Sequence, residues 1–285
     1  MTRAMETVLS FNSADATLIG VLALPPDDVP RAATGLIIVV GGPQYRAGSH
    51  RQFVLLARSL AAAGHPVLRF DYRGMGDSTG EALGFLGASA DIGAALDALQ
   101  TAQPTVKRWV LWGLCDGASA ALLYLHQRPD ARVAGLCLLN PWARSTSSLA
   151  KTHLKHHYGQ RLREKEFWLK LLRGGIARKA LTELLGNLSA AWRAPPKQAG
   201  SFQDRMADAW LRFPGKILLI LSGSDYTAKE FVDYASSNSA WGGAFTRAGV
   251  KRIDINGADH TLSDRAHAAD AEAHTRLFLA QWASS

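Results

Sequence analysis

Short apolar runs recur along the chain, and most are too continuous to form one face of a helix. They are rich in Val, Ile and Leu and are bounded by Gly, Pro, Asn or Asp, which is the pattern of strands. The central runs are apolar throughout, as expected for parallel strands that are buried on both faces. The eight predicted strands cover residues 6–11, 17–24, 35–40, 67–72, 106–113, 133–140, 215–222 and 250–255.

Stretches with helical periodicity separate the strands from the third one onward. The clearest covers residues 51–63, with an apolar stripe at Phe53, Leu56 and Leu60. The other predicted helices cover residues 87–99, 116 to about 126, a segment from about 228, and 263–282. Alternating strands and helices predict an α/β fold with a doubly wound, mostly parallel sheet. Functional groups in such a sheet gather at the carboxyl ends of the strands.

The alternation stops between residues 144 and 210. This segment is basic and helical in pattern, and apolar positions such as Phe167, Trp168 and Leu171 indicate one buried face. It lies between the sixth and seventh predicted strands, so it follows the carboxyl end of a strand. We therefore predict an α/β core domain from residues 1–143 and 211–285, with a helical cap inserted at 144–210.

Composition narrows the class of protein. The 285 residues are 47% hydrophobic and 20% charged, which is typical of a globular chain with one large domain. The two cysteines suggest neither a disulfide framework nor a metal cluster, so we expect reduced thiols and no metal or cofactor. No apolar run has the length of a signal peptide or a membrane span, which favours a cytoplasmic protein.

Positive charge is concentrated in the predicted cap. The net charge of +8 and the pI near 9.7 allow an acidic carrier protein or an anionic surface as a partner at the cap. A solvated helix face is the alternative, and no nucleic-acid-binding module is recognisable, so nucleic acid is not expected. The basic residues of the cap are Lys151, Lys155, Arg161, Arg163, Lys165, Lys170, Arg173, Arg178 and Lys179.

The stretch VLWGLCDGAS, residues 110–119, runs from a predicted strand into a predicted helix through a Gly-x-Cys-x-Gly turn. Gly113 and Gly117 flank Cys115, and they permit a sharp turn in which a Cβ would collide with backbone. The start of the helix favours a thiolate at Cys115. This pattern is that of a nucleophile elbow with cysteine in place of serine. A buried core cysteine is the alternative, and Cys137, in the middle of a strand, is expected to be one.

A nucleophilic cysteine requires a base and an acid that orients the base. Asp225 directly follows the seventh predicted strand, and His260 lies in the loop after the eighth. Cys115, Asp225 and His260 thus each lie just beyond the carboxyl end of a strand, and together they form a candidate triad. Asp259 and Asp233 are second choices for the acid.

The order of these residues resembles the nucleophile–acid–histidine order of the α/β-hydrolase superfamily. The segments GGPQ, FDYRGMGDSTG, GLCDG, SGSD and GADH carry this resemblance across the whole chain except the cap. It implies an α/β-hydrolase fold with an eight-stranded sheet and an inserted cap. More narrowly, GGPQYRAGSHRQF, FDYRGMGDSTG and the elbow resemble the exosortase A system-associated hydrolase 1 family, bacterial proteins encoded beside an exopolysaccharide and protein-sorting system. Dienelactone hydrolases share the Gly-x-Cys-x-Gly elbow but fit the cap and YRGMGDS less well.

A second motif matches a serine nucleophile by its letters alone. Residues 76–80 read Gly-x-Ser-x-Gly, with Ser78 at the centre. Polar and glycine-rich sequence follows this motif in place of an apolar helix, so it lacks the strand–turn–helix context of an elbow. We therefore expect Ser78 to belong to a structural turn.

Residues beside the predicted elbow could hold an oxyanion and a substrate. The backbone N–H of Asp116 is one expected oxyanion donor. Pro43 has no N–H, so Gly42 or Gln44 is expected to supply the second. Trp142 and Leu114 are the candidate substrate-binding residues. His50 is expected to be structural or to line the pocket.

Together these features predict an ester or thioester hydrolase that transfers an acyl group through Cys115. The substrate would be a small-molecule or carrier-bound acyl group. An acyltransferase in exopolysaccharide- or exosortase-linked metabolism is an alternative, because a thioester intermediate also reacts with alcohols and amines. A non-catalytic scaffold of the same system is a second alternative, and the three intact triad residues argue against it.

Overall fold

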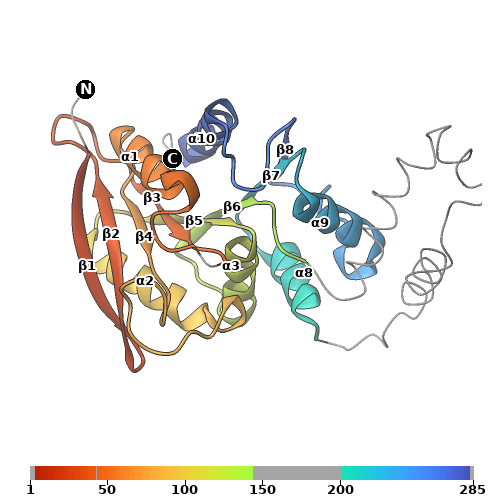
Figure 1. Cartoon of the computed structure of the whole chain (residues 1–285), viewed down its shortest axis with the longest axis horizontal. Coiled ribbons are helices and arrows are strands. Elements are labelled where there is room, and N and C mark those ends of the chain that lie inside the picture. Colours follow the sequence, from red (N-terminus) through yellow and green to blue (C-terminus); the bar gives the residue numbers. More distant parts are fainter. Residues whose placement is uncertain (1–3, 43, 144–199, 283–285) are drawn as a thin grey trace, which may run out of the picture.

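The strands form one twisted sheet at the centre of the molecule (Figure 1). A computed structural model describes residues 4–42, 44–143 and 200–282. Within these residues the eight strands have the order β1-β2-β4-β3-β5-β6-β7-β8, and β2 alone runs in the direction opposite to the other strands. The predicted eight-stranded, mostly parallel sheet is therefore confirmed. The strands are β1 (Met5–Ser13), β2 (Ala16–Leu24), β3 (Thr34–Val39), β4 (Val67–Phe70), β5 (Arg108–Leu114), β6 (Val133–Leu139), β7 (Lys216–Ser222) and β8 (Val250–Ile255).

Helices cover both faces of the sheet, as Figure 1 shows. On one face α1 (Gln52–Ala62) and α10 (Arg265–Leu279) pack over an apolar core that includes Ile38 and Trp112. On the other face a second core packs against the remaining α-helices of the described residues, which are α2 (Ser89–Ala102), α3 (Asp116–Gln127), α8 (Phe202–Arg212) and α9 (Tyr226–Ser237). The single-turn 3-10 helices in the same residues are η1 (Ser49–Arg51), η2 (Phe85–Gly87), η4 (Ser239–Trp241) and η5 (Ala280–Trp282).

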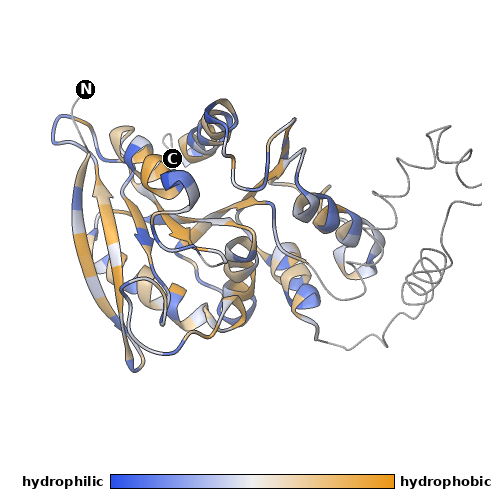
Figure 2. Cartoon of the chain, viewed as in Figure 1, coloured by the Kyte–Doolittle hydropathy of each residue, from blue (hydrophilic) through white to orange (hydrophobic). Residues whose placement is uncertain are grey.

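The continuous apolar runs of the sequence form the inner strands of the sheet, as predicted. Every residue of β3 is buried, and Figure 2 shows hydrophobic residues along the central strands. Parallel pairing places the carboxyl ends of β3, β5, β6, β7 and β8 along one edge of the sheet. We call this the carboxyl edge, and the loops that leave it carry the candidate site.

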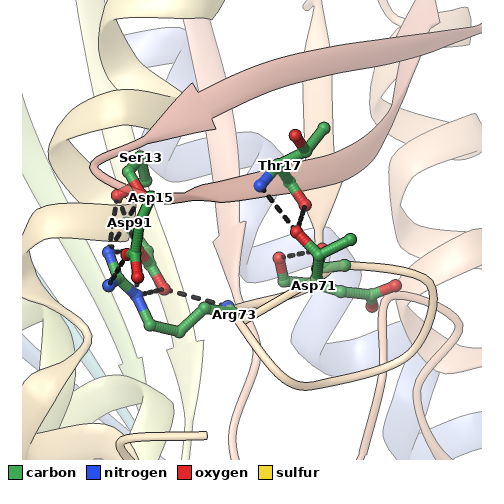
Figure 3. Close-up of polar contacts among 8 residues, drawn as sticks. Ser13, Asp15, Thr17, Asp71, Arg73 and Asp91 are labelled. Atoms are coloured by element: carbon green, nitrogen blue, oxygen red, sulfur yellow. Dashed lines mark hydrogen bonds and ion pairs between the residues drawn. The ribbon is translucent and has the colours of Figure 1, made fainter. Parts of the chain in front are cut away.

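The hairpin between β1 and β2 is tighter than the sequence predicted. Residues 12–16, between the first two predicted strands, were expected to form a loop. Instead Ser13 pairs with Ala16, which leaves a two-residue turn in which Ala14 has a φ of 50°. The Ser13 hydroxyl is buried and donates to Asp91 at 2.7 Å. Figure 3 shows the Arg73 guanidinium beside the same carboxylate, which Arg73 contacts at 2.8 Å. This buried partner explains how a polar residue extends the strand.

Most of the predicted cap, residues 144–199, lies outside the described residues. The described end of that segment forms α8, whose first turn is capped by the Ser201 hydroxyl, which accepts from the Asp204 N–H at 3.1 Å. Met206 and Trp210 of α8 are fully buried in the core that also includes α3. The described end of the predicted cap thus packs against the α/β core.

Candidate active site

Cys115 lies at the turn between β5 and α3, in a backbone conformation that residues other than glycine rarely adopt. Its φ is 59° and its ψ is −124°. Such a conformation typically costs about 1–3 kcal/mol and is concentrated at functional sites. The Cys115 N–H donates to the Leu139 carbonyl at 2.9 Å, which anchors the turn to the end of β6. The strand–turn–helix geometry of the predicted elbow is therefore present.

The two glycines of the elbow have no room for a side chain. A Cβ on Gly113 would lie 2.5 Å from the Ala118 nitrogen, and one on Gly117 would lie 2.3 Å from the Val39 carbonyl oxygen. Both contacts are with backbone, so no side chain can move aside to relieve them. Close packing of α3 against β3 and β5 therefore requires glycine at both positions.

Replacing Gly117 with alanine is expected to lower the free energy of unfolding by about 1–3 kcal/mol, as overpacking does. Gly93→Ala on α2 is the matched control, since its added Cβ would lie 3.5 Å from the Tyr124 ring of α3, an ordinary contact. That change should be neutral or stabilising by about 0.5–1 kcal/mol. Urea denaturation measures both values, and equal stabilities of the two variants would contradict the packing argument.

Asp225 connects the end of β7 to the start of α9 and is 6% exposed. Its carboxylate accepts from the backbone N–H groups of Thr227 at 3.0 Å and Ala228 at 3.2 Å, which caps α9. The same carboxylate lies 2.8 Å from Nδ1 of His260. The loop between β8 and α10 carries this histidine. The helix cap thus fixes the carboxylate that orients the imidazole.

The electrostatic environment of His260 favours the imidazolium. The hydrogen bond with Asp225, followed by that with Cys115, raises the pKa of His260 to about 10. Partial burial opposes this shift, and the negative charges of the same two residues add to it. The three predicted triad residues therefore lie together, with His260 between the carboxylate and the sulfur.

The second-choice acids lie elsewhere. Asp259 accepts from the Ser263 N–H at 2.9 Å and also bonds the Ser263 hydroxyl, and these bonds lower the pKa of its carboxyl. Asp233 lies on α9 and lines a groove with Lys229 and Arg252. The partner of the imidazole Nδ1 is Asp225, the first-choice acid.

Ser78 has a structural place in the loop after β4. Its hydroxyl donates to the Asp71 carbonyl at 2.8 Å and accepts from the Ile19 N–H at 2.9 Å. Figure 3 shows Asp71 and Thr17 in this region, where the loop lies against β2. Both hydrogen bonds are to backbone, in agreement with the expected structural turn.

The loop after β3 contains the glycines expected to shape an oxyanion site. Gly42 has a φ of 61°, and a Cβ on the preceding Gly41 would lie 2.4 Å from the Asp116 Oδ1 atom. The Asp116 side chain therefore packs against this loop, and burial raises the pKa of its carboxyl. Gln44 donates from Nε2 to the Ser49 hydroxyl at 2.9 Å. The Gly42 backbone bonds the Asp116 carboxyl, and this bond opposes the rise in its pKa. The choice between Gly42 and Gln44 as second oxyanion donor stays a prediction.

The remaining candidates differ in where the structure places them. Trp142 is half-buried, and its N–H lies 3.2 Å from the Cys115 carbonyl, next to the elbow. Leu114 is 1% exposed and packs in the core between the sheet and α1, away from the surface of the site. His50 has a φ of 53° in η1 and helps to lower the pKa of Asp259. Cys137 is fully buried, and burial raises the pKa of its thiol to about 12, as expected for a core cysteine.

Sequence analysis missed the brace that holds the loop after β3. Arg46 donates from its backbone N–H to the Asp71 carboxylate at 2.6 Å, and its guanidinium forms ion pairs with Asp71 and Asp77. Asp71 is completely buried at the end of β4. A charged residue directly after an apolar strand is the signal that could have identified this brace.

The described residues contain no group of three or more His, Cys, Asp or Glu side chains arranged to hold a metal ion. None of their helices is long and apolar enough to cross a membrane.

Comparison with known proteins agrees with this geometry. Residues 36–273 match the sequence pattern of the alpha/beta hydrolase family. The uncharacterized protein RP471 of Rickettsia prowazekii is 34% identical over 89 residues, which span 31% of this chain and 37% of that protein. The chain thus covers little more than a third of that relative's length.

Solved structures share the fold at low sequence identity. The esterase Pf2001 of Pyrococcus furiosus is 16% identical, with a TM-score of 0.63 over 98% of this chain and 94% of that one. A dienelactone hydrolase from Anabaena variabilis is 14% identical, with a TM-score of 0.62 over 99% and 100% of the two chains. These likenesses confirm the predicted α/β-hydrolase fold. Because the family pattern extends from β3 to α10, this chain belongs to the alpha/beta hydrolase family.

Proposed function

We propose that this protein transfers an acyl group from an ester or thioester through Cys115, with His260 as base and Asp225 as the residue that orients it. The observation that supports this most directly is the 2.8 Å contact between His260 Nδ1 and the Asp225 carboxylate. His260 also forms a hydrogen bond with Cys115, so it contacts both the proposed acid and the proposed nucleophile. A cysteine in a strained turn beside such a pair has the arrangement of an activated nucleophile.

In the acylation step, the Cys115 sulfur forms a bond to the substrate carbonyl carbon. The backbone N–H of Asp116 stabilises the resulting oxyanion, and such a donor typically contributes about 3–4 kcal/mol. As the tetrahedral intermediate collapses, the bond to the leaving alkoxide or thiolate breaks, and His260 gives that group a proton. In the second step, water or another acceptor attacks the thioester while His260 takes its proton, and Cys115 departs as the thiolate.

The acceptor in the second step decides between hydrolysis and transfer. A thioester reacts with alcohols and amines as well as with water, so the same residues serve a hydrolase and an acyltransferase. We propose a dedicated acyl substrate over general ester hydrolysis, because cysteine replaces serine at the elbow. We propose that this substrate belongs to exopolysaccharide-linked metabolism, and the likeness of the elbow and of FDYRGMGDSTG to the exosortase A system-associated hydrolases supports this.

Mass spectrometry of the intact protein tests the proposed nucleophile. Incubation with p-nitrophenyl acyl esters of increasing chain length should add one acyl group to the wild-type protein and none to Cys115→Ala. Cys137→Ala is the matched control and should acylate as the wild type does, since its thiol is fully buried on β6. Adding alcohol or amine acceptors to the acylated protein then separates transfer from hydrolysis. Equal labelling of Cys115→Ala and wild type would exclude Cys115 as the nucleophile.

A further inference from the structure

Asn140 follows the last residue of β6 and lies between the loops that carry the three candidate triad residues. Its side chain is completely buried, although it is polar. The amide Nδ2 donates to the Ser222 hydroxyl at 2.9 Å and to the His260 carbonyl oxygen at 3.2 Å. The amide oxygen accepts from the Ser222 N–H at 2.8 Å. One side chain thus joins the end of β6 to the end of β7 and to the histidine loop.

Asn140, like Cys115, has a positive backbone φ. Its φ is 46°, a left-handed value that residues other than glycine adopt rarely, and asparagine more often than most. Its N–H donates to the Ile220 carbonyl at 3.0 Å, which fixes this conformation against β7. Strain of this kind persists only where the surrounding contacts enforce it, and it is concentrated at functional sites.

The chain directly after Asn140 returns to the nucleophile. The Trp142 N–H lies 3.2 Å from the Cys115 carbonyl and 3.0 Å from the Ser119 hydroxyl. That hydroxyl donates to the Trp142 carbonyl at 2.7 Å, and Ser119 is fully buried on α3. Residues 140–142 therefore contact the elbow on one side and the histidine loop on the other.

We propose that Asn140 is a positioning residue that holds the His260 loop in register with the Cys115 elbow and with Asp225. This inference rests on the proposed function, since it assigns Asn140 a part in the reaction of that triad. Asn140 does not touch the reacting atoms. It acts through the His260 backbone, and through Ser222, which lies three residues before Asp225. A displacement of about 1 Å between reacting groups can lower a rate by about 100-fold.

Two substitutions separate positioning from simple loss of packing. Asn140→Ala removes all three side-chain hydrogen bonds and should lower the acylation rate of Cys115 by about 10–100-fold, with little change in its dependence on substrate concentration. Asn140→Asp keeps the oxygen that accepts from Ser222 but loses the amide donor. A buried carboxyl resists ionisation, and its protonated form regains one donor. The rate of the Asp variant relative to wild type should therefore rise as the pH falls, while that of the Ala variant should stay constant.

Thr275→Val is the matched control for a lost buried hydrogen bond. Thr275 is fully buried in α10, donates to the Ala271 carbonyl at 2.8 Å and lies 3.7 Å from the Cys137 sulfur, so its described partners lie outside the candidate triad. At equal folded fraction, measured by circular dichroism, its acylation rate should match that of the wild type. The NMR signal of the His260 Nδ1 proton gives a readout that does not depend on activity. It should shift or vanish in Asn140→Ala and be unchanged in Thr275→Val.

The two proposals fail in different ways. If wild-type protein is not acylated at Cys115, the proposed function is wrong, and the NMR comparison still tests the position of the imidazole. If the wild type is acylated and Asn140→Ala reacts at the same rate with an unchanged Nδ1 signal, Asn140 has no positioning role. The same conclusion follows if both Asn140 variants lose activity only in proportion to their unfolded fraction.

Discussion

Replacing His260 with alanine is expected to slow the reaction of Cys115 with iodoacetamide and with activated acyl esters at neutral pH. General acid–base groups of this kind typically contribute about 10²–10⁴-fold to a rate. Iodoacetamide reports the thiolate without requiring a bound acyl substrate, so it isolates activation of the sulfur. His126→Ala is the matched control, because His126 forms a similar contact with Asp208 at 2.9 Å. Equal alkylation rates for His260→Ala and wild type would exclude activation by the imidazole.

The pH dependence of this reaction follows from the raised pKa of His260, about 10. Below that pH the imidazolium persists beside Cys115. The difference in alkylation rate between wild type and His260→Ala should therefore be largest near neutral pH and shrink as the pH rises through about 10.

The raised pKa of His260 should also make the free energy of unfolding depend on pH. The folded-state pKa of His260, about 10, lies above the ordinary value of about 6.5 expected in the unfolded chain. The unfolded chain therefore releases this proton first as the pH rises. The stabilisation is fully present below about pH 6.5 and is lost as the pH rises through 10. The stability difference between wild type and His260→Ala should shrink over that interval.

The sequence was most informative where local pattern and topology agree. Continuous apolar runs identified the strands, because a strand buried on both faces excludes polar side chains at nearly every position. The order of Cys115, Asp225 and His260 then pointed to one candidate site, because the carboxyl ends of parallel strands share one edge. The elbow was predictable from Gly113 and Gly117, since only glycine fits there.

The burial of a polar residue could not be predicted from the hydrophobic pattern where its hydrogen-bond partner lies far along the chain. Ser13 continues β1 because Asp91, 78 residues later, accepts its hydrogen bond. Asn140 was assigned only to the end of a strand, and its partner His260 is 120 residues away. Leu114 was predicted to bind substrate from its place beside Cys115 in the sequence. That place does not reveal that its side chain packs in the core. Each of these depends on tertiary packing.

Asp225 has two roles in this structure, and substitutions at this position can separate them. Its carboxylate caps α9 through the Thr227 and Ala228 N–H groups, and it also bonds His260. Asparagine is as good a helix cap as aspartate, whereas alanine lowers stability by about 1 kcal/mol. An amide, however, is uncharged and can donate to Nδ1, so it no longer stabilises the imidazolium beside Cys115.

Asp225→Asn is therefore expected to keep the stability that comes from the helix cap, to lose the part linked to the raised pKa of His260, and to acylate about 10²–10⁴-fold more slowly. Asp225→Ala should lose both activity and about 1 kcal/mol of stability. Asp264→Ala is the matched control, since Asp264 caps α10 by accepting from the Ala266 N–H at 2.8 Å. It should lose a similar amount of stability and acylate as the wild type does. Stopped-flow acylation and urea denaturation measure the two quantities, and an active Asp225→Asn would remove Asp225 from the triad and leave it only as a cap.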